Sequence, residues 1–195
     1  MFVSLRERYN KLLENKTVRY WVKEWVEPII VAFILAMFIR TFFIQAFKIP
    51  TGSMRDTLIE GDRILVAKCY YWFKQPERGD VIVFKFPLNE KRDFIKRLIG
   101  KPGERVHIEK GNIYINDKLV ETPAVIRKIY YYTREDFPYG KEGVDIVVPP
   151  DSYFVLGDNS AHSHDSRAWG FVKRKEILGK AFFIFWPPKR WQIIT

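Results

Sequence analysis

A single serine directly after a long apolar segment is the first residue that could do chemistry. The stretch IPTGSMRDTLIEGDRILVAK, residues 49–68, places Ser53 between a glycine and a methionine. A hydroxyl is a poor nucleophile at neutral pH until a neighbouring group removes its proton in the transition state. Serine is also common in turns, so its chemistry depends on which side chain elsewhere can act as the base.

The chain has three histidines, His107, His162 and His164, that could serve as that base. With the adjacent Asp165, His162 and His164 permit a Ser-His-Asp arrangement, and the three histidines together permit a zinc site. Nothing else in the sequence resembles a set of metal ligands, and the segment GDNSAHSHDSR is typical of an exposed polar loop. We therefore expect an exposed loop there, with no metal.

Lys96, in DFIKRLIG (93–100), is the alternative base. A free lysine has a pKa of about 10.4, so it acts as a base only where burial lowers that pKa by several units. In an extended segment Lys96 shares one face with Phe94 and Leu98, an unusual setting for a solvated charge. Lysines on half-exposed strands are nevertheless common, so these residues alone leave the choice between lysine and histidine open.

Short β-type segments must position these groups. EKGN and INDKL predict hairpin turns, KPGE predicts a tight turn, and only KRKEIL indicates a helical turn. The looser segment at about 121–150 is interpreted as an insertion over the sheet. The expected fold is mainly β, a partly closed antiparallel β structure on one N-terminal transmembrane helix. Seven segments rich in β-branched or aromatic residues and bounded by turn residues are the predicted strands: 63–68, 80–86, 93–100, 105–110, 112–117, 152–158 and 180–186.

An apolar run near the N-terminus predicts the membrane helix. PIIVAFILAMFI (28–39) is too short to cross about 30 Å of hydrocarbon, but extending it to Phe47 gives about that length and includes Arg40. The run has no polar face, which argues against a surface helix of a soluble domain. No small-residue cleavage site follows it, which argues against a cleaved signal peptide. We expect a retained anchor over residues 26–47.

Charge predicts the orientation of this anchor. Six Lys and Arg residues lie within residues 1–25, whereas residues 48–63 after the run hold Lys48, Arg55 and Arg63. The positive-inside rule then keeps a basic N-terminus (1–25) in the cytoplasm and places residues 48–195 outside the cytoplasmic membrane. The net charge of +10 suits an anionic phospholipid surface. No nucleic-acid partner is expected, because no basic helix interleaved with aromatics is present.

Several blocks of sequence follow one another in a recognisable order: a basic N-terminus, the apolar span, FKIPTGSMRDTL, GDRILVAK, RGDVIVF, DFIKRLIGKPGE and GDNSAHSHDSRAWG. With these blocks in this order, the whole chain resembles bacterial type I signal peptidases, the membrane-bound serine endopeptidases that remove signal peptides from exported preproteins. The resemblance implies cleavage after small residues of an Ala-x-Ala pattern, signal peptides of secreted preproteins as partners, proximity to the export translocon, and no cofactor.

The resemblance also implies roles for individual residues. Ser53 is the expected nucleophile and Lys96 the expected general base. Ser163 corresponds to the serine that orients the lysine, and Thr51 to the hydroxyl that joins the Ser53 N–H in the oxyanion hole. Structural support is expected from the pair Asp165 and Arg167 with Arg97 near them, and from the turn Gly157, Asp158 and Asn159. The residues expected to line the substrate pockets are Ile49, Pro50, Met54, Leu58, Phe94 and Ile95.

One position departs from the family. Asp56 stands where proline is usual, and an aspartate can cap a turn through its side chain, so we expect the local geometry to survive.

Two other classes of protein stay open: another serine–lysine peptidase of related β fold, such as a self-cleaving repressor, and an inactive membrane-anchored homologue. The apolar segment argues against the first, and intact Ser53, Lys96 and Ser163 argue against the second.

Overall fold

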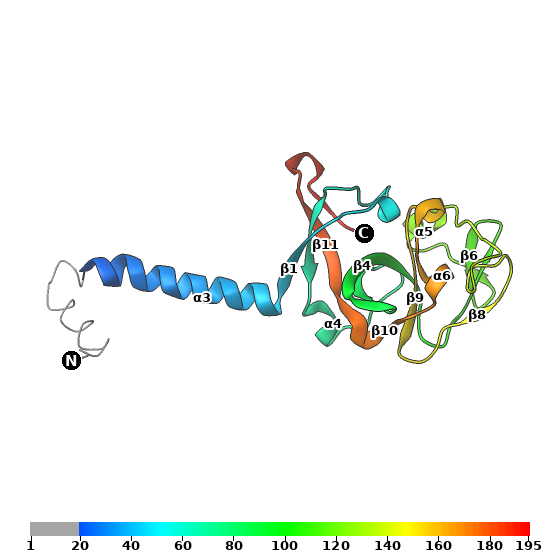
Figure 1. The fold of residues 1–195 in the computed structure, drawn as a ribbon, viewed down its shortest axis with the longest axis horizontal. Coiled ribbons are helices and arrows are strands. Elements are labelled where there is room, and N and C mark those ends of the chain that lie inside the picture. The colour runs from blue at the N-terminus through cyan, green and yellow to red at the C-terminus, as the bar shows by residue number, and fades with distance from the viewer. Residues whose placement is uncertain (1–19) are drawn as a thin grey trace. The chain divides into compact units, whose positions relative to one another are not determined.

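The computed structural model describes residues 20–195, in two units that meet at the peptide between Phe43 and Ile44 (Figure 1). The first unit contributes a helix. The second contains all the described strands of the chain, and with them every residue expected to take part in the chemistry. Most of the predicted basic N-terminus, residues 1–19, lies outside the described residues.

The helical unit consists of a π-helical turn, η1 (Val22–Val26), and α3 (Glu27–Phe42). Over Lys23–Phe42 it is 20 residues long and apolar enough to cross a membrane, and none of those side chains is buried within the structure. Pro28 is tolerated because the first turn of a helix needs no N–H partner there. The membrane anchor itself stays a prediction.

The helix is shorter than predicted. We expected one apolar helix through Phe47, but α3 ends at Phe42, and Ile44–Lys48 forms β1, which pairs with β2 from Ile44↔Ala67 to Lys48↔Arg63. Pairing with β2 satisfies the backbone groups of this segment in the second unit. Residues 44–48 (IQAFK) therefore form a half-buried strand and are not part of the helix.

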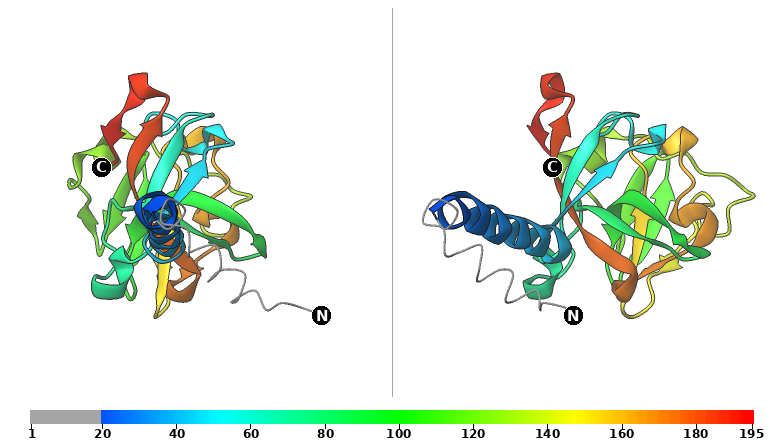
Figure 2. Two further views of the ribbon diagram at one scale, coloured as in Figure 1. Left: turned by 90° about the vertical axis from the view of Figure 1, so that its left-hand side faces the viewer. Right: turned by 60° about the vertical axis from the view of Figure 1, so that its left-hand side comes forward.

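Two antiparallel sheets make up the second unit. The larger has the order β1-β2-β11-β3-β4-β9-β10, with β12 also pairing with β11, and the smaller has the order β7-β6-β5-β8. Figure 2 shows β12, in red, folded back beside the end of β11. The strands are β1 (Ile44–Lys48), β2 (Arg63–Ala67), β3 (Val81–Phe86), β4 (Asn89–Gly100), β5 (Arg105–Glu109), β6 (Asn112–Ile115), β7 (Lys118–Leu119), β8 (Ile146–Val147), β9 (Ser152–Leu156), β10 (Val172–Lys173), β11 (Ile177–Trp186) and β12 (Gln192–Ile193).

All seven predicted strands are present, as β2, β3, β4, β5, β6, β9 and β11. The two predicted hairpin turns are also confirmed: Lys110–Gly111 joins β5 to β6, Asn116–Asp117 joins β6 to β7, and all four residues have positive φ. Such φ values match the right-handed twist of a hairpin. The predicted helical turn in KRKEIL is η4 (Arg174–Glu176).

The sequence did not predict the remaining short helices, because segments of three to five residues carry no helical periodicity. Those beside the site are η2 (Gly52–Met54), η3 (Ser160–His162) and α6 (Ser166–Trp169); the others are α4 (Tyr70–Phe73), α5 (Ala124–Lys128) and η5 (Pro188–Arg190). Residues 121–150 contribute α5 and β8, and their Ile126, Tyr131 and Ile146 are buried in the core of the smaller sheet.

Candidate active site

Ser53 lies in the short helix η2, and two buried neighbours fix this turn. Thr51 is extended, and the chain then turns so that the Met54 carbonyl accepts hydrogen bonds from the N–H groups of Thr57 and Leu58. Met54 and Leu58 are fully buried in a core cluster of the larger sheet. Because these side chains are held in the core, the turn presents Ser53 to a cavity on its other side.

Lys96 is the group that contacts this serine. Its Nζ lies 2.6 Å from Ser53 Oγ and 2.9 Å from the Ile95 carbonyl oxygen, and only 4% of the lysine is exposed. Burial lowers the pKa of Lys96 to about 8, although the charges of Asp165 and Asp158 act in the opposite direction. A lysine with such a pKa is substantially neutral at mildly alkaline pH, and its lone pair can then accept the serine proton.

Asn159 holds the serine turn in place. Its side-chain Nδ2 donates to the Gly52 carbonyl at 2.9 Å, and its backbone N–H donates to the Ser53 carbonyl at 3.1 Å. Gly157 packs directly against the serine turn. A Cβ at this position would lie 2.4 Å from the Ser53 carbonyl oxygen and 2.2 Å from Ser163 Oγ. The turn 157–159 therefore fits against the serine turn only with glycine at position 157.

Ser163 is close to this contact but does not complete it. Its side chain is buried, and its Oγ has no hydrogen-bond partner within residues 20–195. The hydrogen bond to Lys96 that the resemblance implies is therefore not formed in this structure. Instead, the Ile95 carbonyl oxygen accepts a hydrogen bond from Lys96 Nζ, in addition to the one that Nζ makes with Ser53.

Arg97 has a carboxylate partner of its own. It forms a fully buried ion pair with Asp158, with Nε–Oδ1 at 2.8 Å and Nη2–Oδ2 at 2.7 Å. Thr57 joins them, accepting from Arg97 and donating to Asp158. We expected Arg97 near the Asp165–Arg167 pair and predicted no partner for it; the carboxylate that it binds is Asp158, and this ion pair ties β4 to the turn after β9.

Asp165 and Arg167 form the expected acid–base pair. Nε and Nη2 of Arg167 donate to the two carboxylate oxygens at 2.9 and 2.8 Å, and both side chains are buried. Asp165 also caps α6 through the Arg167 N–H and accepts from the Gly157 N–H. Arg167 further donates to Ser160 Oγ at 2.8 Å. The pair thus shapes the loop that carries Ser163.

A cavity of about 240 Å³ opens beside Ser53 and Lys96. Of the residues expected to line the substrate pockets, Pro50, Phe94 and Ile95 do so. Ile49, Met54 and Leu58 do not, because they are at most 2% exposed and belong to the core. The other lining residues are Thr51, Asp93, His162 and His164.

Asp93 and the two histidines were not predicted to lie in this cavity. The signal available for the histidines was their spacing, because residues 162 and 164 flank the buried Ser163 and its extended backbone turns both to the same side. They lie on an exposed loop as expected, but this loop forms a wall of the cavity.

One edge of β4 is open at this cavity. Residues 93–96 pair with β3 on one side, whereas β9 reaches only Arg97, Leu98 and Gly100 on the other, as judged from residues 20–195. A strand edge of this kind can accept an extended peptide through main-chain hydrogen bonds.

His107 lies elsewhere, on β5 of the smaller sheet. It stacks on Tyr114 and contacts Asp145 at 3.1 Å, and with Asp117 and Asp145 it forms the one group of ligand-type side chains found close together in the described part of the chain. Arg105 already pairs with both aspartates. The zinc set of three histidines considered from the sequence is not brought together.

Asp56 adopts a backbone that proline cannot take. Its φ is +86°, whereas the proline ring fixes φ near about −65°. The expectation that aspartate preserves the geometry of the usual proline is therefore wrong at this residue, although the turn at Ser53 is formed.

Comparisons with known proteins agree with one another. The family model described as "Signal peptidase, peptidase S26" matches residues 22–186. A Synechocystis protein named "Probable signal peptidase I-2" is 40% identical over 95% of this chain and 83% of its own. The "Signal peptidase I" of Leptolyngbya laminosa is 41% identical over 86% and 81%. A Staphylococcus aureus protein named "Inactive signal peptidase IA" is 32% identical over 92% and 97%.

Proposed function

The chain belongs to the signal peptidase family, peptidase S26, and on that premise we propose that it removes signal peptides with Ser53 as nucleophile and Lys96 as general base. The observation that carries this assignment is the 2.6 Å contact between Lys96 Nζ and Ser53 Oγ in a buried setting that lowers the lysine pKa to about 8. A nucleophile within hydrogen-bond reach of its base is the arrangement that covalent peptide hydrolysis needs.

The reaction follows from this geometry. Neutral Lys96 takes the proton of Ser53 as Oγ attacks the scissile carbonyl carbon, and the protonated lysine then gives that proton to the departing amine. The acyl-enzyme is hydrolysed when Lys96 deprotonates a water that attacks the ester carbonyl, and the protonated lysine then returns the proton to Ser53 Oγ as the carboxylic acid leaves. The Ser53 N–H and the Thr51 hydroxyl, which lies at the same cavity, stabilise the oxyanion.

The cavity supports cleavage after small residues. Pro50, Phe94 and Ile95 form a wall of bulky apolar groups next to the reacting groups, and such a wall favours small apolar side chains such as alanine beside the scissile bond. An extended peptide that pairs with the open edge of β4 presents alternate side chains to this wall. We propose an Ala-x-Ala pattern before the cut.

The membrane setting completes the proposal. The apolar helix Lys23–Phe42 anchors the enzyme in the cytoplasmic membrane with the N-terminus inside, and residues 48–195 act at the outer face, close to the export translocon. The support is the length and composition of the helix together with the basic residues that precede it. The enzyme then meets its substrate at the phospholipid surface.

Cleavage of a preprotein with an Ala-x-Ala site, in detergent or lipid, tests the catalytic assignment. We expect Lys96→Ala and Ser53→Ala to abolish cleavage. Lys118→Ala, which removes an exposed lysine on β7, is the matched control and should retain it, as should His162→Ala/His164→Ala in substantial part. Full cleavage without Lys96 would overturn the Ser-Lys assignment. No cleavage by the wild-type chain would favour an inactive homologue, the class to which the name of the Staphylococcus aureus relative points.

A further inference from the structure

Two histidines that the proposed reaction does not use face the cavity at Ser53. His162 and His164 are both exposed and both line it, while Ser163 between them is buried. Ser163 is extended, with φ −110° and ψ 126°, so its two neighbours project to the same side. The loop therefore presents a pair of imidazoles to any peptide bound over Ser53.

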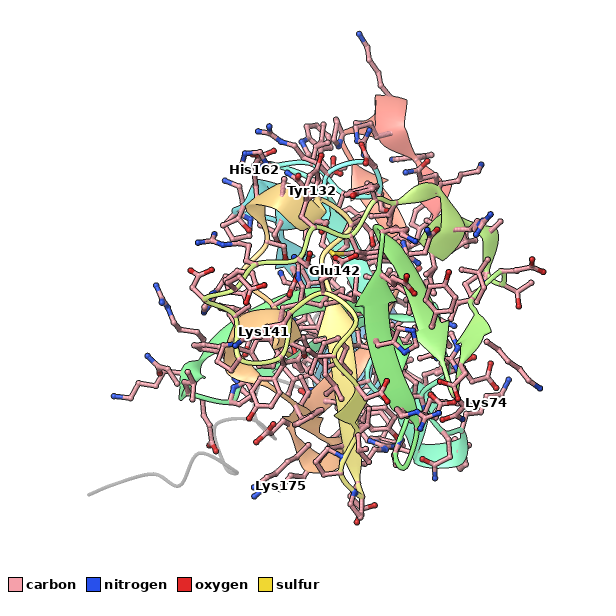
Figure 3. All side chains as sticks on the ribbon, turned by 90° about the vertical axis from the view of Figure 1, so that its right-hand side faces the viewer. Lys74, Tyr132, Lys141, Glu142, His162 and Lys175 are labelled. Carbon is pink, nitrogen blue, oxygen red and sulfur yellow. The ribbon has the colours of Figure 1, made fainter. Side chains whose placement is uncertain are left out.

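A second hollow lies against the same two histidines. It has a volume of about 270 Å³, and its wall shares His162, Ser163 and His164 with the loop that borders the first cavity. Tyr132 and Arg134 also line it. Figure 3 shows His162 and Tyr132 at the same edge of the domain. A peptide that extends past Ser53 in this direction runs over the imidazoles into the second hollow.

The two hollows share His162 and His164 but differ in polarity, and we call them the apolar end and the polar end. The first cavity has the apolar wall of Pro50, Phe94 and Ile95, whereas the second hollow includes the guanidinium groups of Arg134 and Arg167. Small side chains before the cut fit the apolar end. The residues after the cut must then leave by the polar end.

The polar end has few carboxylates to balance its bases. Asp93 is the one acidic side chain among the lining residues of the two hollows, and it pairs with Lys85 at 2.7 Å. Arg167 is neutralised by the buried Asp165, and Arg134 pairs with Asp136, but that second pair is exposed to solvent. Apart from Asp93, no acidic side chain of the described residues lines either hollow, so a carboxylate of a bound peptide meets the exposed imidazoles with no acidic lining residue of the second hollow beside them.

We propose that His162 and His164, with the hollow beyond them, bind the first residues of the mature protein and favour a carboxylate side chain there. The inference rests on the proposed peptidase function and adds a specificity for the side of the substrate that follows the cut. An imidazole N–H donates a hydrogen bond to a carboxylate, and a charged partner makes that bond shorter and stronger than a neutral one. A lysine at the same substrate position is disfavoured by the same groups.

The test compares preprotein substrates that are identical except for Glu, Gln or Lys at the first, second or third residue after the cut. Because each ratio of kcat/KM is taken within one enzyme, an effect of a variant on the chemical step cancels. For wild type we expect Glu to exceed Gln by about fivefold at one of these positions and Lys to fall below both. In His162→Ala/His164→Ala the ratio of Glu to Gln should fall to about one.

His107→Ala is the matched control, because it removes the third histidine of the chain from the smaller sheet and should leave the ratio unchanged. The single variants His162→Ala and His164→Ala divide the effect between the two side chains, and their exposure makes loss of folding a poor explanation for a changed ratio. A wild-type ratio near one at all three positions, or a ratio that survives the double variant, overturns the inference while cleavage continues. Absence of cleavage of every substrate would instead contradict the proposed function.

Discussion

Lys96 Nζ lies 2.6 Å from Ser53 Oγ, although 43 positions of sequence separate the two residues. β4 supplies the lysine from a strand paired with β3 through Ile82↔Lys96. The serine comes from a turn held by core side chains on one side and by Asn159 on the other. Each reacting group is therefore fixed by a different part of the larger sheet, which limits the motion needed to bring them together.

The pH dependence of cleavage should report the lysine. Burial lowers the pKa of Lys96 to about 8, and only the neutral amine can accept the serine proton, so kcat/KM should rise with pH through about 8 and level off above it. The rate is lost on the acidic side because protonation removes the lone pair. Measurement of kcat/KM across this range with one preprotein substrate checks the prediction.

Lys96→Arg sharpens the same prediction. A guanidinium stays protonated at every pH at which the protein is folded, so this variant should lose at least about a thousandfold in kcat/KM and should not recover at alkaline pH. A profile without an alkaline rise in the wild type, or an active Lys96→Arg enzyme, would contradict lysine as the base.

Asp56 should respond to substitution according to its backbone. At φ +86° a glycine is relaxed, so Asp56→Gly should raise the free energy of unfolding by up to about 1 kcal/mol. Asp56→Pro requires a different φ and should lower it by about 3 kcal/mol or more. Denaturant unfolding in detergent measures both, and Asp56→Asn, which changes the charge but tolerates positive φ, is the control expected to stay near wild type.

Much of the fold follows from local signals. β-branched and aromatic runs between turn residues predict the seven strands, and the pairs Lys110–Gly111 and Asn116–Asp117 predict their turns, because both signals act within a few residues. β1 was missed since FFIQAF (42–47) continues the apolar run of the helix before it, and the pairing with β2 is what makes residues 44–48 a strand. The polar start of β4, residues 89–92, is likewise a strand because of the hairpin that it forms with β3.

In the candidate active site, too, some features could be predicted from the sequence and others depend on contacts with distant segments. Ser53 and Lys96 could be named from the motifs, and their contact fits that expectation. The partner of Arg97 and the burial of Ile49, Met54 and Leu58 could not be predicted, because each depends on which distant segment covers it. A motif identifies which residues matter but does not determine whether a side chain faces the cavity or the core.

Ser163→Ala separates a catalytic contribution from a structural one. Because Ser163 Oγ has no partner in the described residues, its removal should change the free energy of unfolding by less than about 0.5 kcal/mol. Hydrogen bonds in an active site often form only in the substrate complex, so we still expect kcat/KM to fall by roughly 10- to 100-fold as Lys96 loses an orienting partner. Thermal unfolding and cleavage assays on one preparation compare the two effects. Unchanged cleavage would remove Ser163 from the mechanism.

Asp158→Ala should destabilise the protein far more than the removal of an exposed charge. It leaves the fully buried guanidinium of Arg97 without its carboxylate, which costs on the order of 3–5 kcal/mol. Arg97→Met/Asp158→Leu removes both charges and should recover part of that loss, although the Gly79 carbonyl then loses the donor that it has in the wild type. Asp136→Ala breaks the exposed pair with Arg134 and should change stability by less than about 1 kcal/mol. If Asp158→Ala and Asp136→Ala unfold at the same denaturant concentration, the buried pair does not hold β4 against the turn at Asn159, and the placement of Lys96 must depend on the pairing of β4 with β3 alone.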